Sequence, residues 1–157
     1  MFKKSITIVL AGIIMAGCTS FFNDKPGEVI GFQDKSVATI FVDSNSFEVE
    51  IVSTPESTTQ GLSGRDEIGH DGMLFIFSET RQRNFWMKDM QFAIDIIWIN
   101  QGVVIGFSEN VPPPEESTPL YDVPLYSSGA PVDMVLELPA GAVAANKITI
   151  GSLIKFR

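Results

Sequence analysis

Four residues, Arg65, Trp86, Lys88 and Asp95, have side chains whose types and surroundings suit ligand binding. Asp95 is the most informative, because the run from residue 92 to residue 99 is otherwise apolar on both faces. We therefore expect Asp95 to be buried. An unpaired buried carboxylate costs several kcal/mol, so it must be neutralised, hydrogen-bonded or paired with a cation. Asp95 is then either a structural residue or a carboxylate at the mouth of a pocket.

Arg65 follows two glycines, Gly61 and Gly64, which permit left-handed turns and a close approach of the backbone to a neighbour. Its guanidinium group offers a fork of donors that suits a carboxylate or a phosphate. Arg65 could therefore hold an anionic ligand, or it could pair with a neighbouring acidic side chain.

Trp86 and Lys88 alternate with Phe85 and Met87, so in a strand one pair packs inside while the other reaches a surface or a groove. An aromatic plane beside a cation is a common way to hold a sugar or a planar anion. In the alternative arrangement, Trp86 packs in the core while Lys88 extends its charged end to solvent.

The sequence contains no complete catalytic or metal-binding motif. His70 is the only histidine, with no second histidine or cysteine near it, so a zinc site is not expected. No Gly-x-Ser-x-Gly elbow or Walker-type loop is present. Asp66, Glu67 and Glu109 could supply a glycosidase-type acid and base, although the sequence does not fix the separation of their carboxylates. We expect no cofactor and assign no catalytic residue.

The elements that must position these side chains are mainly strands. Residues 37–42 and 47–52 are rich in β-branched and aromatic residues, and the polar residues between them are typical of a hairpin turn. In the second run, apolar residues alternate with Glu48 and Glu50, so one face is buried and the other is wet. We expect this hairpin at an edge or at the surface of the sheet.

Local signals extend this pattern along the chain. Thr54 as a cap, Pro55 at the first helical position and Gly61 as a stop predict a helix of about two turns. The predicted fold is all-β with one or two short helices, most economically a β-sandwich or a flattened barrel. Further strands are expected at 73–77, 84–87, 94–99, 103–107 and 134–138, with a closing strand at 148–156. An irregular crossing with six prolines is expected at 111–131, and a helical turn or two at 139–146.

The first residues have the layout of an export signal. Lys3 and Lys4 precede an uncharged apolar stretch of about eleven residues, which is too short to span a membrane. Residues 15–18, Met-Ala-Gly-Cys, resemble the lipobox of bacterial lipoproteins, in which the cysteine is lipidated and becomes the new N-terminus. Two or three acyl chains on Cys18 would anchor the protein to a membrane at about 0.8 kcal/mol per buried CH₂.

The expected organisation is a signal peptide at 1–17, a lipidated tether at 18–35 and a single domain at 36–157. Thr19 follows the cysteine, and the absence of aspartate there resembles lipoproteins sorted to the periplasmic side of an outer membrane, where the cell has one. Loss of residues 1–17 leaves 9 basic against 19 acidic side chains, a balance of −10. So acidic a surface repels nucleic acid, and we expect no nucleic-acid partner.

Four motifs occur in a fixed order along the predicted domain. They are QGLSGR at 60–65, GMLFIF at 72–77, NFWMKD at 84–89 with Asp95 following, and VLELPAG at 135–141. Their order and spacing resemble those of the domain of unknown function 192 family, DUF192, of small bacterial and archaeal proteins. The resemblance implies a compact β-sandwich-like domain, often exported, and it brings no established activity, substrate or cofactor. The chain departs from the family pattern at Ala93 and Ile94, where a Pro-Leu pair is usual, and in lacking cysteines in the proline-rich crossing.

Among the family motifs, the cations nearest to Asp95 are Lys88 and Arg65, so an ion pair with one of them is the structural expectation. The leading hypothesis is a ligand- or partner-binding module of the cell envelope. Its groove would be lined by Arg65, Trp86, Lys88 and Asp95 and would hold a small anionic or carbohydrate ligand or an envelope protein. The alternative is a hydrolase that acts on envelope glycan or a small ester, using Asp95 with a second acid or base. A third possibility is a purely structural assembly factor, and the oligomeric state stays open.

Overall fold

The computed structural model describes residues 31–157, and the predicted signal peptide, Cys18 and most of the predicted tether lie outside them. Within this part, no helix is long and apolar enough to cross a membrane. The elements are β1 Val37–Val42, β2 Asn45–Val52, α1 Pro55–Gln60, β3 Gly72–Trp86, β4 Ile94–Asn100, β5 Val103–Val111, the 3₁₀ helix η1 Leu120–Asp122, β6 Leu125–Pro139, α2 Ala142–Ala145 and β7 Ile154–Phe156.

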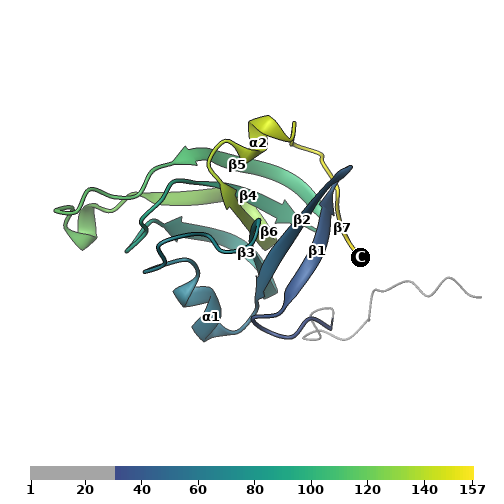
Figure 1. Cartoon of the computed structure of the whole chain (residues 1–157), viewed down its shortest axis with the longest axis horizontal. Coiled ribbons are helices and arrows are strands. Elements are labelled where there is room, and N and C mark those ends of the chain that lie inside the picture. Colours follow the sequence, from purple (N-terminus) through teal and green to yellow (C-terminus); the bar gives the residue numbers. More distant parts are fainter. Residues whose placement is uncertain (1–30) are drawn as a thin grey trace, which may run out of the picture.

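The seven strands form one sheet in the order β5-β4-β6-β3-β2-β1-β7. The sheet curls into a half-barrel, with α1 and α2 on opposite sides of it in Figure 1. The segment before β7 also bonds to β5 at the other edge, because Val104 donates to the carbonyl of Ser152 and Val103 bridges to Leu153. The predicted mainly β fold is confirmed, and the single curled sheet corresponds to the flattened-barrel alternative.

Apolar side chains cover both faces of this sheet. On one face, Leu74 and Leu136 belong to a cluster that α2 joins through Val143. On the other face, Met73 and Val135 belong to a second cluster, which the segments after α1 and after β3 cover. The alternation of the two sets along each strand follows from the two-residue period of side chains in β structure.

The long pair of β3 and β6 differs from the sequence prediction. We expected two separate strands within β3, and we expected residues 125–131 in an irregular crossing; both are wrong. β3 is one strand of 15 residues, and β6 pairs with it along its length. The register shifts between Ile76 and Arg81 and again between Gln82 and Asn84. Such bulges break the alternation of polar and apolar residues, and this concealed the continuity of the strand in the sequence.

The closing strand is also shorter than expected, because the strand covers only Ile154–Phe156, while residues 148–152 are irregular or turn structure and Leu153 forms a single β-bridge. The hairpin of β1 and β2 is confirmed. Gln101 and Gly102, both of which have positive φ, form the tight turn between β4 and β5. The helix prediction is confirmed as well, since Thr54 caps α1 and Gly61 follows its last residue.

Residues just before β1 help to fix α1. The Asp34 carboxylate accepts hydrogen bonds from Ser57 Oγ at 2.6 Å and from the backbone N–H of Ser53 at 2.8 Å. Phe32 packs against Phe156 with ring centroids 5.0 Å apart. These two residues, which we placed in the tether from the sequence, therefore contact the folded domain.

Gly72 is required where β2, β3 and β6 meet. A Cβ at this position would collide with the carbonyl oxygen of Glu137 and would lie 2.7 Å from Leu138 Cδ2. Only a residue without a side chain lets the two backbones approach this closely. The glycine of the GMLFIF motif thus allows the close approach of β3 and β6 at this point.

Candidate functional site

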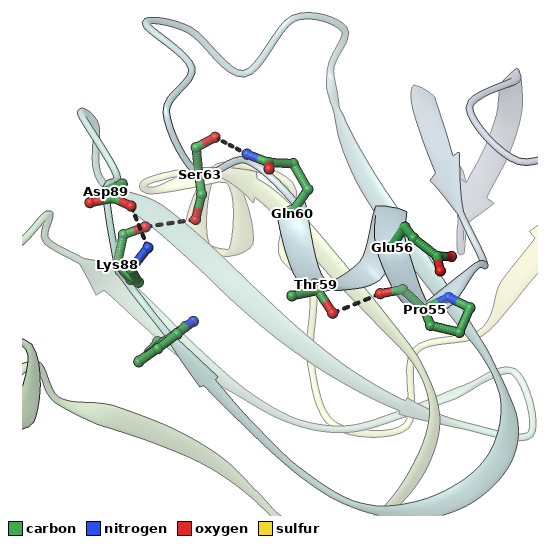
Figure 2. Close-up of a pocket in the computed structure, with 8 residues that line it drawn as sticks. Pro55, Glu56, Thr59, Gln60, Ser63, Lys88 and Asp89 are labelled. Carbon is green, nitrogen blue, oxygen red and sulfur yellow. Dashed lines mark hydrogen bonds and ion pairs between the residues drawn. The ribbon is translucent and has the colours of Figure 1, made fainter.

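A groove of about 510 Å³ lies between α1 and the turn that follows β3. Figure 2 shows side chains of α1 on one side of it and Lys88 with Asp89 on the other. Trp86, the last residue of β3, also lines the groove and is 44% exposed. The groove is lined by Pro55, Glu56, Thr59, Gln60, Ser63, Trp86, Lys88 and Asp89.

Buried methionines hold the turn that presents Lys88 and Asp89. Met87 and Met90 both pack in the cluster on that face of the sheet, and the backbone N–H of Met90 donates to the carbonyl of Met87 at 3.1 Å. Asp89 has a positive φ of 57°, which reverses the chain tightly. The predicted alternation is confirmed, because Met87 and Phe85 point inward while Trp86 and Lys88 reach the groove.

The loop after α1 is locked to this turn by hydrogen bonds. Ser63 Oγ donates to the carbonyl of Lys88 at 2.7 Å, and the backbone N–H of Gly64 donates to the carbonyl of Asp89 at 2.8 Å. Gln60 Nε2 donates to the carbonyl of Ser63 at 2.6 Å. The QGLSGR and NFWMKD motifs therefore form the two joined walls of one groove (Figure 2).

The charges in the groove nearly cancel. Lys88 Nζ lies 2.6 Å from Asp89 Oδ2, and the ammonium group keeps two further N–H donors. Glu56 adds a second carboxylate to the lining. The groove thus offers one cation, two anions, hydroxyl and amide groups and one aromatic plane, an arrangement that suits a neutral ligand with many hydroxyl groups.

A second groove of about 430 Å³ lies on the other side of the same turn and also includes Lys88 and Asp89. Glu115, Glu116 and Leu120 contribute to its far wall. These residues belong to the segment between β5 and β6, which projects beyond the sheet in Figure 1. The turn therefore stands between two adjoining hollows.

Arg65 lies outside the groove. Its guanidinium group forms a two-point ion pair with Glu50 of β2, with N–O distances of 2.8 and 3.0 Å. The hydrogen bond from Arg65 is the main reason that the pKa of the Glu50 carboxyl is lowered. Of the two roles that we considered for Arg65, the structure shows the pairing with a neighbouring acid. This pair fixes the loop after α1 to β2 across the edge of the second apolar cluster.

Asp95 is fully buried, as predicted, with an exposed fraction of 0%. The expected ion pair with Lys88 or Arg65 is wrong. Asp95 Oδ1 instead accepts a hydrogen bond from the backbone N–H of Asn110 at 2.7 Å, and Oδ2 accepts one from Val143 at 2.8 Å. Backbone N–H groups satisfy a buried carboxylate without a buried countercharge, so no cation is needed. Asp95 thereby ties β4 to the end of β5 and to α2.

The four predicted site residues therefore separate into two groups. Trp86 and Lys88 line one groove, whereas Arg65 and Asp95 stabilise the loops and strands around it. Asp66 and Glu67 lie with Arg65 in a shallow hollow on the far side of the QGLSGR loop.

Glu137 is an unusual residue that we did not single out from the sequence. It is 6% exposed and lies on β6 directly between Met73 of β3 and Ile96 of β4. No hydrogen bond to its carboxyl group is found among the described residues, and burial raises its pKa to about 8. The signal that could have identified it is the single charge within the apolar run Val135 to Leu138.

Comparisons with known proteins agree with this architecture. A search of the curated proteins finds no match to the chain. Among solved structures, a protein of Sinorhizobium meliloti described as a "putative transcription regulator" is 28% identical, with a TM-score of 0.69, over 80% of this chain and 98% of that one. A protein of unknown function from Novosphingobium aromaticivorans is 25% identical, with a TM-score of 0.66, over 76% of this chain and 84% of that one.

The family comparison covers most of the described domain. A sequence model of DUF192, a family described as "Uncharacterized ACR", matches residues 38–156. This span contains all four motifs, both walls of the groove and the buried residues Asp95 and Glu137. The chain belongs to the DUF192 family.

Proposed function

We propose that this protein is a carbohydrate-binding module of the cell envelope and that the groove beside α1 holds a sugar. The observation that carries the proposal is the half-exposed Trp86 in a groove whose other lining residues, apart from Pro55, have polar side chains. An exposed indole is costly to hydrate, and its face packs well against the C–H groups of a sugar ring. The surrounding hydroxyl, amide and carboxylate groups can bond the sugar hydroxyls.

The charge of the groove favours a neutral sugar over a small anion at this position. Asp89 already occupies one donor of Lys88, and Glu56 leaves the lining with a net negative charge. A free carboxylate or phosphate at Trp86 would therefore be repelled, whereas sugar hydroxyls can both donate to the carboxylates and accept from the ammonium group.

The structure gives Asp95 no access to a substrate. Both of its oxygens are bonded to backbone N–H groups, and the residue has no exposed surface. These contacts support a binding module over a hydrolase that uses Asp95. The transcription-regulator description of the Sinorhizobium protein is likewise not carried over, because a balance of 11 basic against 19 acidic side chains opposes binding to nucleic acid.

The envelope location is proposed from the N-terminal sequence. Lys3, Lys4, the short apolar stretch and the Met-Ala-Gly-Cys ending support export and lipidation of Cys18. Mass spectrometry of the protein extracted from membranes is expected to show a mature chain beginning at Cys18 with acyl chains attached. A cytosolic protein that retains residues 1–17 would contradict this part of the proposal.

Sugar binding can be followed through the indole N–H signals in NMR spectra, using neutral oligosaccharides of glucose and of N-acetylglucosamine as probes. The signal of Trp86 should shift on titration, while that of Trp98, which is buried, should not. Trp86→Ala should weaken binding about tenfold or more, corresponding to about 1.4 kcal/mol.

Tyr121→Ala is the matched control, because Tyr121 is an aromatic residue with 86% exposure that lies outside the groove lining. It should leave the affinity unchanged. The proposal fails if neither oligosaccharide series shifts the Trp86 signal at concentrations of about 10 mM, a range that covers even very weak binding. It also fails if both alanine variants weaken binding equally.

A further inference from the structure

A further hollow, of about 340 Å³, shares Thr59 with the groove and is lined by two arginines. Two of the four arginines in the sequence, Arg81 and Arg83, line it, and none of the residues that line it is acidic. The hollow is lined by Thr58, Thr59, Phe77, Arg81, Gln82, Arg83, Asn84 and Phe85.

The bulges of β3 build this hollow. The register shift after Ile76 leaves residues 77–80 outside the regular pairing, and this places the carbonyl of Glu79 2.7 Å from Arg83 Nη2, which donates to it. The Arg83 Cζ atom lies 3.8 Å from the centre of the Phe77 ring, so the guanidinium group is held over an aromatic face. The backbone N–H of Arg83 donates to Ser128 Oγ at 3.0 Å on β6.

The two guanidinium groups have no bonded countercharge. Neither Arg81 nor Arg83 forms an ion pair with an acidic side chain of residues 31–157. Arg83 Nε is buried and has no acceptor within the same part of the chain. Burial and the nearby charge of Arg81 lower the pKa of Arg83, and the exposed Glu79 opposes this effect. Bringing two like charges together is unfavourable, and an anion between them would relieve the repulsion.

The groove and the hollow are adjacent. Thr59 of α1 lines both, and Asn84 in the hollow lies two residues from Trp86 on β3, with its side chain on the same side of the strand. A glycan of two or three sugar units that stacks on Trp86 could therefore place a substituent near Arg81 and Arg83.

We propose that the hollow around Arg81 and Arg83 binds an oxyanion group, a carboxylate or a phosphate, carried by the glycan that occupies the neighbouring groove. This inference rests on the proposed function, because the glycan that binds in the groove is what carries the anion. It makes the expected ligand an acidic glycan. Arginine suits this role because its planar donors match the two oxygens of a carboxylate or a phosphate.

The test uses NMR signals of the arginine Nε–H and tryptophan indole N–H groups in the full protein, at ionic strength kept constant with sodium chloride. The probes are inorganic phosphate, glucuronate and glucose. Phosphate should shift the signal of Arg83, glucose should shift the signal of Trp86, and glucuronate should shift at least the Arg83 signal. An acidic oligosaccharide of uronate units should shift both signals and bind more tightly than its neutral counterpart by about tenfold.

Three variants complete the test. Arg81→Gln removes an exposed guanidinium group without disturbing the core, and it should reduce phosphate affinity at least fivefold. Glu79→Gln removes the one opposing charge and should strengthen phosphate binding about twofold. Arg157→Gln is the matched control, because this exposed arginine lies at the C-terminus, outside the hollow, and it should have no effect.

The possible failures are distinguishable. If phosphate leaves the Arg83 signal unchanged, or if Arg157→Gln weakens binding as much as Arg81→Gln, the oxyanion site is refuted while sugar binding at Trp86 can still hold. If phosphate shifts Arg83 but no sugar or oligosaccharide shifts Trp86, the proposed function is refuted, and with it the assignment of the oxyanion to a glycan.

Discussion

Replacing Glu137 by glutamine is expected to stabilise the protein at pH 9 by several kcal/mol and to change its stability at pH 4 by less than about 1 kcal/mol. Glu137 is buried on β6 between Met73 and Ile96, without a hydrogen-bond partner among the described residues. Burial disfavours its charged form and raises its pKa from 4.5 to about 8. The folded protein therefore holds this carboxyl group neutral at pH values at which the unfolded chain ionises it.

The direction of the pH dependence follows from this difference. Below about pH 4.5 Glu137 is neutral in both states and contributes no penalty. As the pH rises from about 4.5 to about 8, the unfolded chain releases a proton that the folded protein retains, so folding becomes less favourable. Above pH 8 the penalty is complete, and it corresponds to on the order of 5 kcal/mol. Glutamine has nearly the same shape and cannot ionise, so the variant does not incur this penalty.

Urea unfolding of the wild type and of Glu137→Gln at pH 4, 6, 8 and 9 measures the free energy of unfolding of each. The difference between the two free energies isolates Glu137, because the two proteins share every other titrating group. Glu48→Gln, at an exposed position on β2, is the matched control and should leave the pH profile unchanged. A wild-type stability that is flat between pH 5 and pH 9, or a Glu137→Gln variant that is less stable at pH 9, would show that the carboxyl group is ionised in the folded protein.

Replacing Asp95 by alanine is expected to lower the free energy of unfolding by about 3 kcal/mol, because an unsatisfied buried N–H costs about 1 to 3 kcal/mol and the Asn110 N–H, which is partly buried, adds a smaller cost to that of the buried Val143 N–H. The substitution removes the side-chain acceptor of the backbone N–H groups of Asn110 and Val143, which lie 2.7 and 2.8 Å from the Asp95 oxygens. For a protein of this size the melting temperature should fall by on the order of 10 °C. Asp95→Asn should restore no more than half of the lost free energy of unfolding, because its amide NH₂ group would face one of the two N–H donors and cannot accept a hydrogen bond from it.

Asp133→Ala serves as the control for Asp95. Asp133 also accepts a backbone hydrogen bond, from Gln101, at a site that water can reach. Water replaces the lost acceptor there, so the loss should stay below about 1 kcal/mol. Equal losses at the two positions would contradict the structural role of Asp95. If Asp95→Ala also leaves the Trp86 signal responsive to sugar in the folded fraction, Asp95 acts on stability and not on the ligand.

The family motifs divide between the interior and the surface of this structure. Gly72, Asp95 and Glu137 lie in the interior, where they set strand spacing, join β4 to two neighbouring segments and introduce a titratable group. Trp86 and Lys88 reach the surface beside α1. A motif that recurs in a family can therefore mark either a packing constraint or a binding surface, and its burial separates the two.

Several features followed from the sequence alone, because each depends on residues that are neighbours along the chain. The alternation in β2 fixed its buried and wet faces, and the residues Thr54, Pro55 and Gly61 fixed both ends of α1. The apolar run around Asp95 correctly predicted that this residue is buried. The alternation of residues 85–88 placed one pair of side chains inside and the other pair outside.

The partners of these residues were decided only by the tertiary structure. The two N–H groups that bind Asp95 lie 15 and 48 residues further along the chain, and the partner of Arg65 lies 15 residues before it. The hollow at Arg81 and Arg83 exists because bulges in β3 displace the register against β6. Side-chain periodicity specifies which face of a strand a residue occupies, whereas pairing register and loop packing specify what it meets there. The sequence therefore determined the burial of Asp95 and the alternation around Trp86 and Lys88, and the fold determined the partners of the candidate residues and which of them share a site.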